Sequence, residues 1–461
     1  MGRRLSETSC KVAVIRLSLS KKQIKQCESL LEEAGRCYSE MILSHVESRK
    51  DKWLSCAELK AKFKGAFRLH SQSIQAVAEK IEANLESART NRDREFKELG
   101  RIKTEYPSES KLSFPVIWKK LGMKAKDGKL HLSNGLKNDP LIVSLPYQYR
   151  LENVNLAELI FDAGVYYLHL TIDTGIVPPQ LSHGKRTAGV DPGEIHIAYC
   201  TTEDGNTIGI SGRQLRSVKR LRNKKHHSLN EQLTRCKNGS KRHKKLSQAK
   251  NKASSKLKRQ QRDILHKASR QLIDFCEENK IASVVMGDVR NISNGVNLGK
   301  KCNQKISQWT HGQFQTYVKQ KARLKGMNTR LINESYSSKT CSNCCHVKSS
   351  SVQGRVYRCS SCGSVIHRDA NGSANICSKG RHGEYGKVQV KNIKYLKPVR
   401  IGFSSPSEAG QVADKMLVST SKSEAPPPRG WGASRVRKKS ITHANWCDAL
   451  EREIMEDFYI V

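Results

Sequence analysis

The chain has 461 residues, enough for two or three domains, and carries 83 Lys and Arg against 43 Asp and Glu. A formal net charge of +40 repels itself in a compact fold, so we expect a polyanionic partner, with nucleic acid favoured over a membrane surface. No run approaches the ~20 consecutive apolar residues that cross a bilayer, and no signal-peptide core follows Met1. These features argue against a membrane protein and predict an intracellular one.

The first 185 residues read as a strand-forming region that is interrupted by helices. The alternation in CKVAVIRLS predicts a strand at 10–18. Residues 21–105 carry apolar side chains at helical spacing, which indicates a packed helical bundle. Residues 113–180 return to short strand-like pieces punctuated by Gly and Pro. The helical segment therefore interrupts one small β-domain.

From residue 187 strands alternate with helices, which predicts an α/β sheet flanked by helices. In chain order we expect a strand in TAGVDP, a hairpin turning at 203–205, a long basic helical region at 211–270, a strand at 281–289, a helix at about 305–325 and a strand in NTRLINES. Beyond about 396 no period is sustained. This tail is predicted to be largely disordered, with a candidate short helix at 445–457.

A pair of cysteine knuckles is the strongest single motif. Cys341-Ser-Asn-Cys344 and Cys359-Ser-Ser-Cys362 are separated by 14 residues, a spacing that suits four thiolates around one structural zinc ion. Cys345 follows the first knuckle, where a glycine is usual, and could be a spare thiol or a competing ligand. We assign the zinc to the four cysteines that keep CxxC spacing.

Two aspartates stand where an RNase H-like fold would use them. Asp191 ends an apolar strand in AGVDPG, and Asp369 lies in HRDANGSANI just before a predicted helix. In such folds an early strand and a late helix each supply an acid to a shared two-metal site, and Mg²⁺ suits it because this ion prefers hard oxygen ligands. An Asp after a strand is more often a turn residue, so the assignment depends on the order of these acids around the zinc ribbon.

In these motifs the sequence resembles the TnpB family, RNA-guided DNA nucleases of bacterial insertion sequences that are related to type V CRISPR effectors and to Fanzor. The resemblance lies in GVDPG, SVVMGDV, NQKISQWTHGQFQTYVKQKARLKG, ESYSSKTCSNC, YRCSSCG and HRDANGSANI, which run in family order over about 187–380. It implies a guide RNA, a double-stranded DNA target beside a short flanking motif, two catalytic Mg²⁺ ions and a structural Zn²⁺. A monomer is favoured.

The resemblance also implies a fold: an α/β RNase H-like (RuvC) domain with a zinc-ribbon insertion, and an N-terminal β-barrel (wedge) domain interrupted by a helical recognition domain. The expected segments are 1–20 and 113–185 for the wedge, 21–112 for the recognition domain, 186–337 and 366–395 for RuvC, 338–365 for the ribbon and 396–461 for the tail.

One departure from the family concerns the second catalytic acid. The family commonly has Glu where this chain has Gly287, followed by the Asp found here at 288. Neighbouring strand residues point to opposite faces, so Asp288 is no simple substitute and stays a candidate for a metal ligand or for a residue that supports one. Glu334, in LINESYSSKTC, ends the strand expected beside SVVMGD, and strands lie ~4.8 Å apart, so its carboxylate could reach the vacated place. The plainer alternative is a solvent-exposed strand-end Glu.

The combined interpretation is an RNA-guided, Mg²⁺-dependent DNA endonuclease that uses Asp191, Glu334 and Asp369. Residues 211–270 hold 21 Lys or Arg against two acids, which suits a channel that contacts the backbone of an RNA–DNA heteroduplex. His367 replaces a common family Asp and, with Gly287 and Cys345, keeps open a guide-dependent DNA-binding protein that has lost cleavage. A guide-free zinc-ribbon DNA-binding regulator is the remaining alternative. The expected compartment is the cytoplasm or nucleoid of a prokaryote, or the nucleus of a eukaryote.

Overall fold

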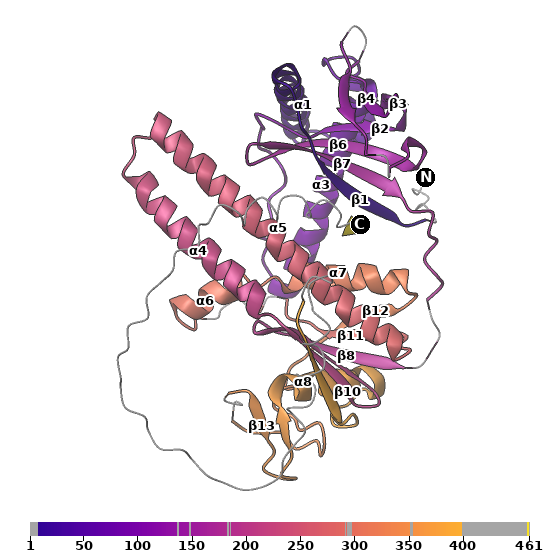
Figure 1. Cartoon of the computed structure of the whole chain (residues 1–461), viewed down its shortest axis with the longest axis vertical. Helices are drawn as coiled ribbons and strands as arrows, with labels where there is room; N and C mark the ends of the chain where they lie inside the picture. Colours follow the sequence, from indigo (N-terminus) through magenta and orange to yellow (C-terminus); the bar gives the residue numbers. More distant parts are fainter. Residues whose placement is uncertain are drawn as a thin grey trace, which may run out of the picture.

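The structure is a computed structural model that describes residues 8–398 and 459–460, apart from 136–137, 147–148, 182–183, 185, 291, 293–296 and 351–353. The predicted disordered tail, with its candidate helix at 445–457, therefore lies outside the described residues except at 459–460. In Figure 1 the N-terminal helices and sheet lie above a second sheet, and the pair α4 and α5 extends to one side.

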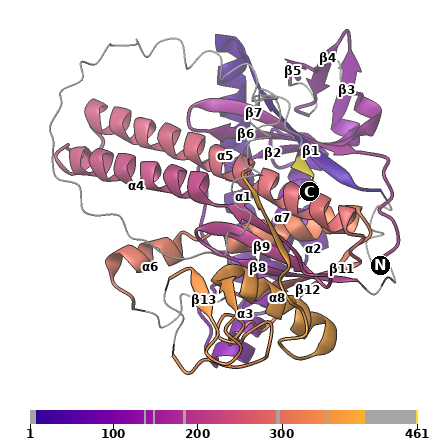
Figure 2. The same ribbon diagram turned by 60° about the horizontal axis from the view of Figure 1, so that its bottom comes forward.

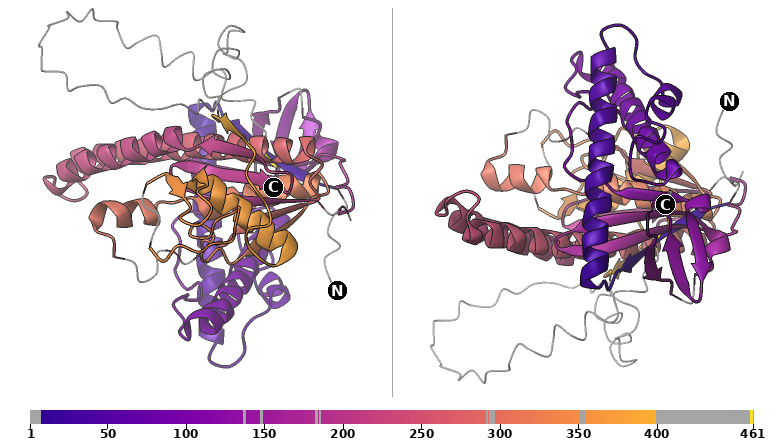
Figure 3. Two further views of the ribbon diagram at one scale, coloured as in Figure 1. Left: turned by 90° about the horizontal axis from the view of Figure 1, so that it is seen from below. Right: turned by 90° about the horizontal axis from the view of Figure 1, so that it is seen from above.

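Three helices fill the segment predicted to be helical: α1 (Lys21–Ser48), α2 (Cys56–Lys62) and α3 (Ser71–Leu99). The first two begin at capping boxes, in which Ser20 pairs with Gln23 and Ser55 pairs with Glu58. Viewed from above, α1 runs across the direction of α4 and α5 (Figure 3, right).

Strands on both sides of this helical segment form two sheets. One has the order β16-β1-β7-β6-β2 and the other the order β3-β4-β5. The bounds are β1 Cys10–Arg16, β2 Val116–Lys119, β3 Met123–Lys126, β4 Lys129–Leu132, β5 Leu141–Ser144, β6 Val154–Asp162, β7 Val165–Asp173 and β16 Tyr459–Ile460, with 3₁₀ turns at Lys120–Gly122 and Leu151–Asn153. Closure into a barrel stays a prediction.

The second sheet has the order β12-β11-β8-β9-β10-β15. Its bounds are β8 Thr187–Pro192, β9 His196–Thr202, β10 Asn206–Ser211, β11 Ser283–Gly287, β12 Asn328–Ile332 and β15 Asn392–Leu396. The hairpin turn falls at 203–205, as predicted, and β11 lies parallel between β8 and β12. β15, which pairs with β10, was not predicted.

Five helices accompany this sheet: α4 Arg213–Thr234, α5 Lys241–Glu278, α6 Lys300–Ser307, α7 His311–Leu324 and α8 Arg368–His382. The basic region forms a hairpin of two helices, α4 and α5 (Figure 2). The turn between them contains Gly239, which has a φ of +76°. The single helix predicted at about 305–325 is instead two, separated at Trp309, whose indole donates to the Gly193 carbonyl. Among the described residues no helix is long and apolar enough to cross a membrane.

The two faces of the second sheet pack against different helices. Ala188 and Val190 of β8 belong to the core formed with α5 and α7. Gly189, between them, lies on α8, where an added Cβ would overlap the backbone of Cys377. Because side chains alternate along a strand, Asp191 projects toward α8 as Gly189 does. The ribbon strands β13 (Val356–Arg358) and β14 (Val365–His367) lie beside α8 (Figure 3, left).

Candidate functional site

Asp191 lies at the end of β8, between the sheet and α8. An added Cβ on Gly372 of α8 would come within 2.5 Å of Asp191 Oδ2, so a glycine allows the helix to approach the carboxylate. Burial raises the pKa of Asp191 well above its ordinary value, and the charges of Glu334 and Asp369 add to the effect. The Asp191 carboxylate therefore interacts with both of the other acids predicted for the metal site.

Glu334 places its carboxylate beside Gly287. β11 and β12 are parallel neighbours in which Gly287 pairs with Ile332, so Glu334 stands two residues beyond the pair. A Cβ built on Gly287 would overlap Glu334 Oε2 and lie 3.1 Å from Cδ. Oε2 is buried and has no hydrogen-bond partner among the described residues. Burial, with a contribution from the charge of Asp288, raises the pKa of Glu334 to about 7.

Asp288 is directed elsewhere. Its backbone N–H donates to Ile332, and its carboxylate accepts from Arg290 Nε at 2.9 Å and Nη2 at 2.6 Å. The hydrogen bond from Arg290 lowers the pKa of Asp288 despite partial burial. Asp288 thus forms an ion pair beside the site, as the alternation of side chains along a strand leads one to expect.

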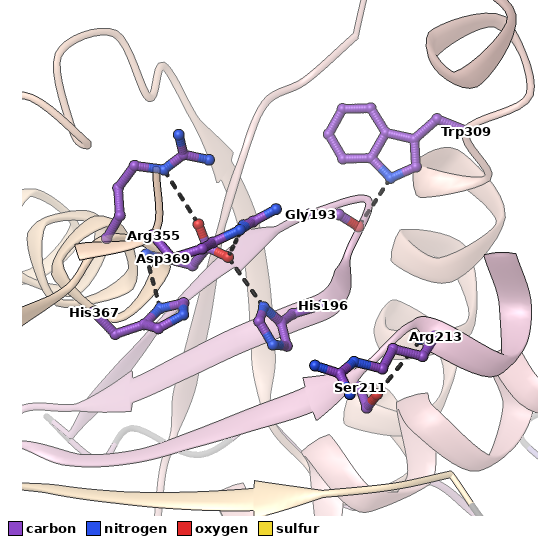
Figure 4. A network of polar contacts seen from close by, with 9 residues as sticks. Gly193, His196, Ser211, Arg213, Trp309, Arg355, His367 and Asp369 are labelled. Carbon is purple, nitrogen blue, oxygen red and sulfur yellow. Dashed lines mark hydrogen bonds and ion pairs between the residues drawn. The ribbon is translucent and has the colours of Figure 1, made fainter. Parts of the chain in front are cut away.

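Asp369 opens α8 and is held by basic side chains (Figure 4). Its Oδ2 accepts from Arg355 Nη1 at 2.8 Å and lies 3.1 Å from His196 Nδ1, and its Oδ1 accepts from Arg368 Nε at 3.4 Å. Burial raises the pKa of Asp369, but the hydrogen bond with His196 and the charge of Arg355 outweigh it and the net shift is downward.

Sequence reasoning did not single out His196, Arg355 or Arg368 as site residues. His196 lies on β9, beside the strand that carries Asp191, and Arg355 belongs to the ribbon. His367 was noted only as a departure from the family. Its ring stacks on Tyr199 with centroids 4.8 Å apart, and its Nδ1 accepts from the Asp369 backbone N–H at 3.3 Å. His367 therefore caps the helix that carries Asp369.

The chemistry of the carboxylates fits a hard cation. Asp191, Glu334 and Asp369 offer oxygen donors, and the unpartnered Oε2 of Glu334 is the kind of buried group that a metal ion satisfies. They do not form a closed cage in this structure. Within the described part of the chain, the groups whose ligand atoms all lie within 4.8 Å of one another are the four knuckle cysteines and the set His196, His367 and Asp369.

The four predicted zinc ligands lie together in the ribbon. Sγ of Cys341 is 3.7 Å from that of Cys362, and Sγ of Cys344 is 3.5 Å from that of Cys359. Tetrahedral Zn–S bonds of ~2.3 Å place sulfur atoms ~3.8 Å apart, so the residues fit zinc. Cys345 lies outside the set: its thiol donates to the Tyr385 carbonyl at 3.3 Å, and its φ of +62° explains why glycine is usual there.

Two buried asparagines connect the ribbon to α8. Asn371 Nδ2 donates to the Thr340 carbonyl at 2.8 Å, and its Oδ1 accepts from the Ser342 N–H at 2.9 Å. Asn375, one helical turn later, donates to the carbonyls of Ser337 and Thr340. The first cysteine knuckle and the helix that carries Asp369 are therefore joined by hydrogen bonds on both sides of Cys341.

Two family models match the chain: the model described as a probable transposase, OrfB of IS605, over 169–293, and the model described as the Cas12f1-like TNB domain over 311–376. A TnpB-like protein of Methanocaldococcus jannaschii, MJ0751, is 27% identical over 197 residues, which cover 42% of this chain and 68% of that protein. Together these matches support a TnpB family protein. The first model includes Asp191, and the second includes Glu334, Asp369 and the four knuckle cysteines, so the matched ranges contain both candidate metal sites.

Two further comparisons extend beyond the TnpB-like proteins. The CRISPR-associated endodeoxyribonuclease Cas12f1 of Sulfoacidibacillus thermotolerans is 28% identical over 112 residues, which cover 24% of this chain and 25% of that protein. A Cas12f1–sgRNA–target DNA complex contains a chain of similar fold, with a TM-score of 0.56 at 15% identity. That match covers 78% of this chain and 83% of the other.

Proposed function

We propose that this TnpB-family chain is an RNA-guided DNA endonuclease in which the catalytic glutamate has moved from position 287 to 334. The observation that carries the proposal is the buried, unpartnered Oε2 of Glu334, which fills the space of a side chain at Gly287 beside Asp191. A buried acid without a partner costs stability, so its presence is explained by a function that needs it.

In the proposed site Asp191, Glu334 and Asp369 would hold Mg²⁺. Magnesium, when bound, supplies activation of water and stabilisation of the leaving oxygen of a phosphodiester. Gly287 and Gly372 leave the space into which the carboxylates of Glu334 and Asp191 project. Arg355 and His196 orient the Asp369 carboxylate, and Asp369 must loosen one of these contacts to bind a metal. The four cysteines would hold zinc and fix the ribbon that carries Arg355.

Guide RNA and target DNA are the proposed partners. The similar Cas12f1 chain is bound to sgRNA and target DNA, and this chain carries a net charge of +40. In the α4–α5 hairpin the tip is basic and contributes nothing to the core: Leu215 is the buried residue of α4, and burial in α5 begins at Ser255. Such a surface suits phosphate contacts, with sequence choice left to base pairing by the guide.

The deciding experiment incubates the purified protein, with the RNA that co-purifies, with a matching duplex and Mg²⁺. Cleavage that disappears in Asp191→Asn and Glu334→Gln supports the proposal. Binding of the matched duplex without cleavage would instead establish a cleavage-deficient DNA-binding protein. Absence of a discrete RNA, together with binding to one fixed duplex sequence, would establish the zinc-ribbon regulator.

A further inference from the structure

A second group of ligand atoms lies beside the carboxylate site. His196 on β9, His367 at the end of β14 and Asp369 at the start of α8 each place a ligand atom within 4.8 Å of the other two. Figure 4 shows both imidazoles next to the Asp369 carboxylate. The side chains of His196 and Asp369 are 16% and 12% exposed, so the group is sheltered but open to small ions.

The donor set differs in kind from three carboxylates. Two imidazoles and one carboxylate with open positions suit borderline ions such as Fe²⁺, Ni²⁺ and Zn²⁺, whereas Mg²⁺ prefers oxygen ligands alone. We propose that His196, His367 and Asp369 bind a divalent transition-metal ion. Because Asp369 belongs to both sets, an ion held here would withdraw it from the magnesium site, so the bound transition metal acts as an inhibitor. That consequence rests on the proposed function, whereas the binding itself does not.

Two features of the structure disfavour binding of a cation at this group. Arg355 and Arg368 contact the same carboxylate, and their charges repel a cation. The Nδ1 of His367 caps α8 at 3.3 Å, a long hydrogen bond that a metal could replace. Arg355 is 37% exposed and can turn to solvent. Removing its charge should therefore tighten metal binding, while removing either imidazole should weaken it.

The test titrates Ni²⁺ into the zinc-loaded full-length protein by calorimetry, without RNA or DNA. Ni²⁺ is chosen because it favours imidazole over tetrahedral thiolate sites. His196→Phe keeps the ring volume, and His367→Asn keeps an acceptor for the helix cap. Each should weaken Ni²⁺ binding at least about tenfold, in the range seen when a metal site loses a supporting group. Arg355→Ala should strengthen it several-fold.

His227→Ala is the matched control, because His227 is exposed on α4 and the chain has 15 histidines that could bind Ni²⁺ adventitiously. Its affinity should equal that of the wild type. Equal affinity in all the histidine variants, or no stoichiometric site, overturns the inference. Melting temperatures show that each variant is folded. Since cleavage is never measured, a failure of the nuclease proposal leaves this result standing, and the converse also holds.

Discussion

The carboxylate of Glu334 fills the space that a side chain on Gly287 would occupy. Gly287 ends one of two neighbouring parallel strands, and its pairing with Ile332 sets the offset that brings Glu334, two residues further on, beside it. A side chain at position 287 would therefore displace the Glu334 carboxylate from its present place. Under the proposed function, the two departures from the family pattern would be one linked change.

Glu334 should matter to cleavage as much as Asp191 does. We expect Glu334→Gln and Asp191→Asn each to lower the cleavage rate by at least about a hundredfold, the scale of losing one preorganised electrostatic group in an active site. Asp288→Asn should cost far less, because Asp288 pairs with Arg290. Single-turnover cleavage of a matched duplex measures all three. Near-normal cleavage by Glu334→Gln would exclude the relocation.

If the proposed relocation is right, a glutamate at position 287 should replace one at position 334. Gly287→Ala forces a Cβ into the Glu334 carboxylate and should destabilise the protein by about 1–3 kcal/mol as overpacking does. Gly287→Glu combined with Glu334→Ala should recover part of the cleavage that Glu334→Ala loses. Denaturant unfolding and the cleavage assay provide the two measurements. Gly312→Ala is the matched control, since an added Cβ there meets nothing within 4 Å.

Stability should depend on pH through Glu334. Its folded-state pKa of about 7 exceeds the ordinary 4.5, so the folded state holds the proton more tightly and loses stability as pH rises from about 4.5 to 7. Glu334→Gln removes this loss of stability at high pH. In the metal-free protein the variant should therefore gain stability over the wild type at pH 8, by at most roughly 3 kcal/mol, and gain less at pH 5. Melting temperatures at both pH values measure it.

Asp288 should make folding stability depend on pH in the opposite direction. The pKa of Asp288 is lowered, so its ion pair stabilises the fold above the ordinary pKa of 3.8 and this stabilisation disappears as pH falls through the lower folded value. Asp288→Asn should therefore be destabilising at neutral pH and neutral in strong acid. A pH-independent effect of Glu334→Gln would mean that the carboxylate is solvated.

Zinc content should follow the four knuckle cysteines. We expect one zinc ion per chain in the wild type and none in Cys341→Ser. The variant should also have a lower melting temperature, because structural zinc contributes folding energy. Cys345→Gly should keep the metal and be tolerated, since its backbone has a φ of +62°. Metal analysis by mass spectrometry tests both. Loss of zinc in Cys345→Gly would reassign the ligand set.

DNA binding should be strongly salt-dependent through the α4–α5 hairpin. Neutralising Lys241, Lys244 and Lys245 to Gln should reduce the slope of log K against log salt by up to about 0.9 for each DNA phosphate that these lysines neutralise in the wild type. Equilibrium binding of the guide-loaded protein to DNA at several salt concentrations gives the slope. An unchanged slope would place the phosphate-binding residues elsewhere on the surface.

Much of this architecture could be predicted because the hydrophobic period is a local property and strands that follow one another in the chain are often neighbours in a sheet. The hairpin turn at 203–205 and the pairing of β11 with β12 followed from such patterns and are confirmed. β15 was not predicted because NIKYL is a short edge strand in which buried residues do not alternate regularly. The break at Trp309 depends on a hydrogen bond to Gly193, which lies 116 residues away, so no local pattern encodes it.

The surroundings of the candidate site were harder to predict than its acids. Asp191 and Asp369 could be proposed because they stand in a recognisable order around the cysteine knuckles. Arg355 and His196 meet Asp369 only because the ribbon folds back on the helix and β9 lies beside β8. Those interactions join separate elements and depend on tertiary packing, which one sequence does not reveal.

The asparagine links between α8 and the first knuckle connect the proposed zinc site to the candidate carboxylate site. Asn371 and Asn375 hold the backbone on both sides of Cys341 and belong to the helix that begins at Asp369. Oxidation of the thiols would therefore loosen the helix that carries Asp369 without touching a carboxylate. If the proposed function holds, cleavage would then depend on the redox state of the cysteines.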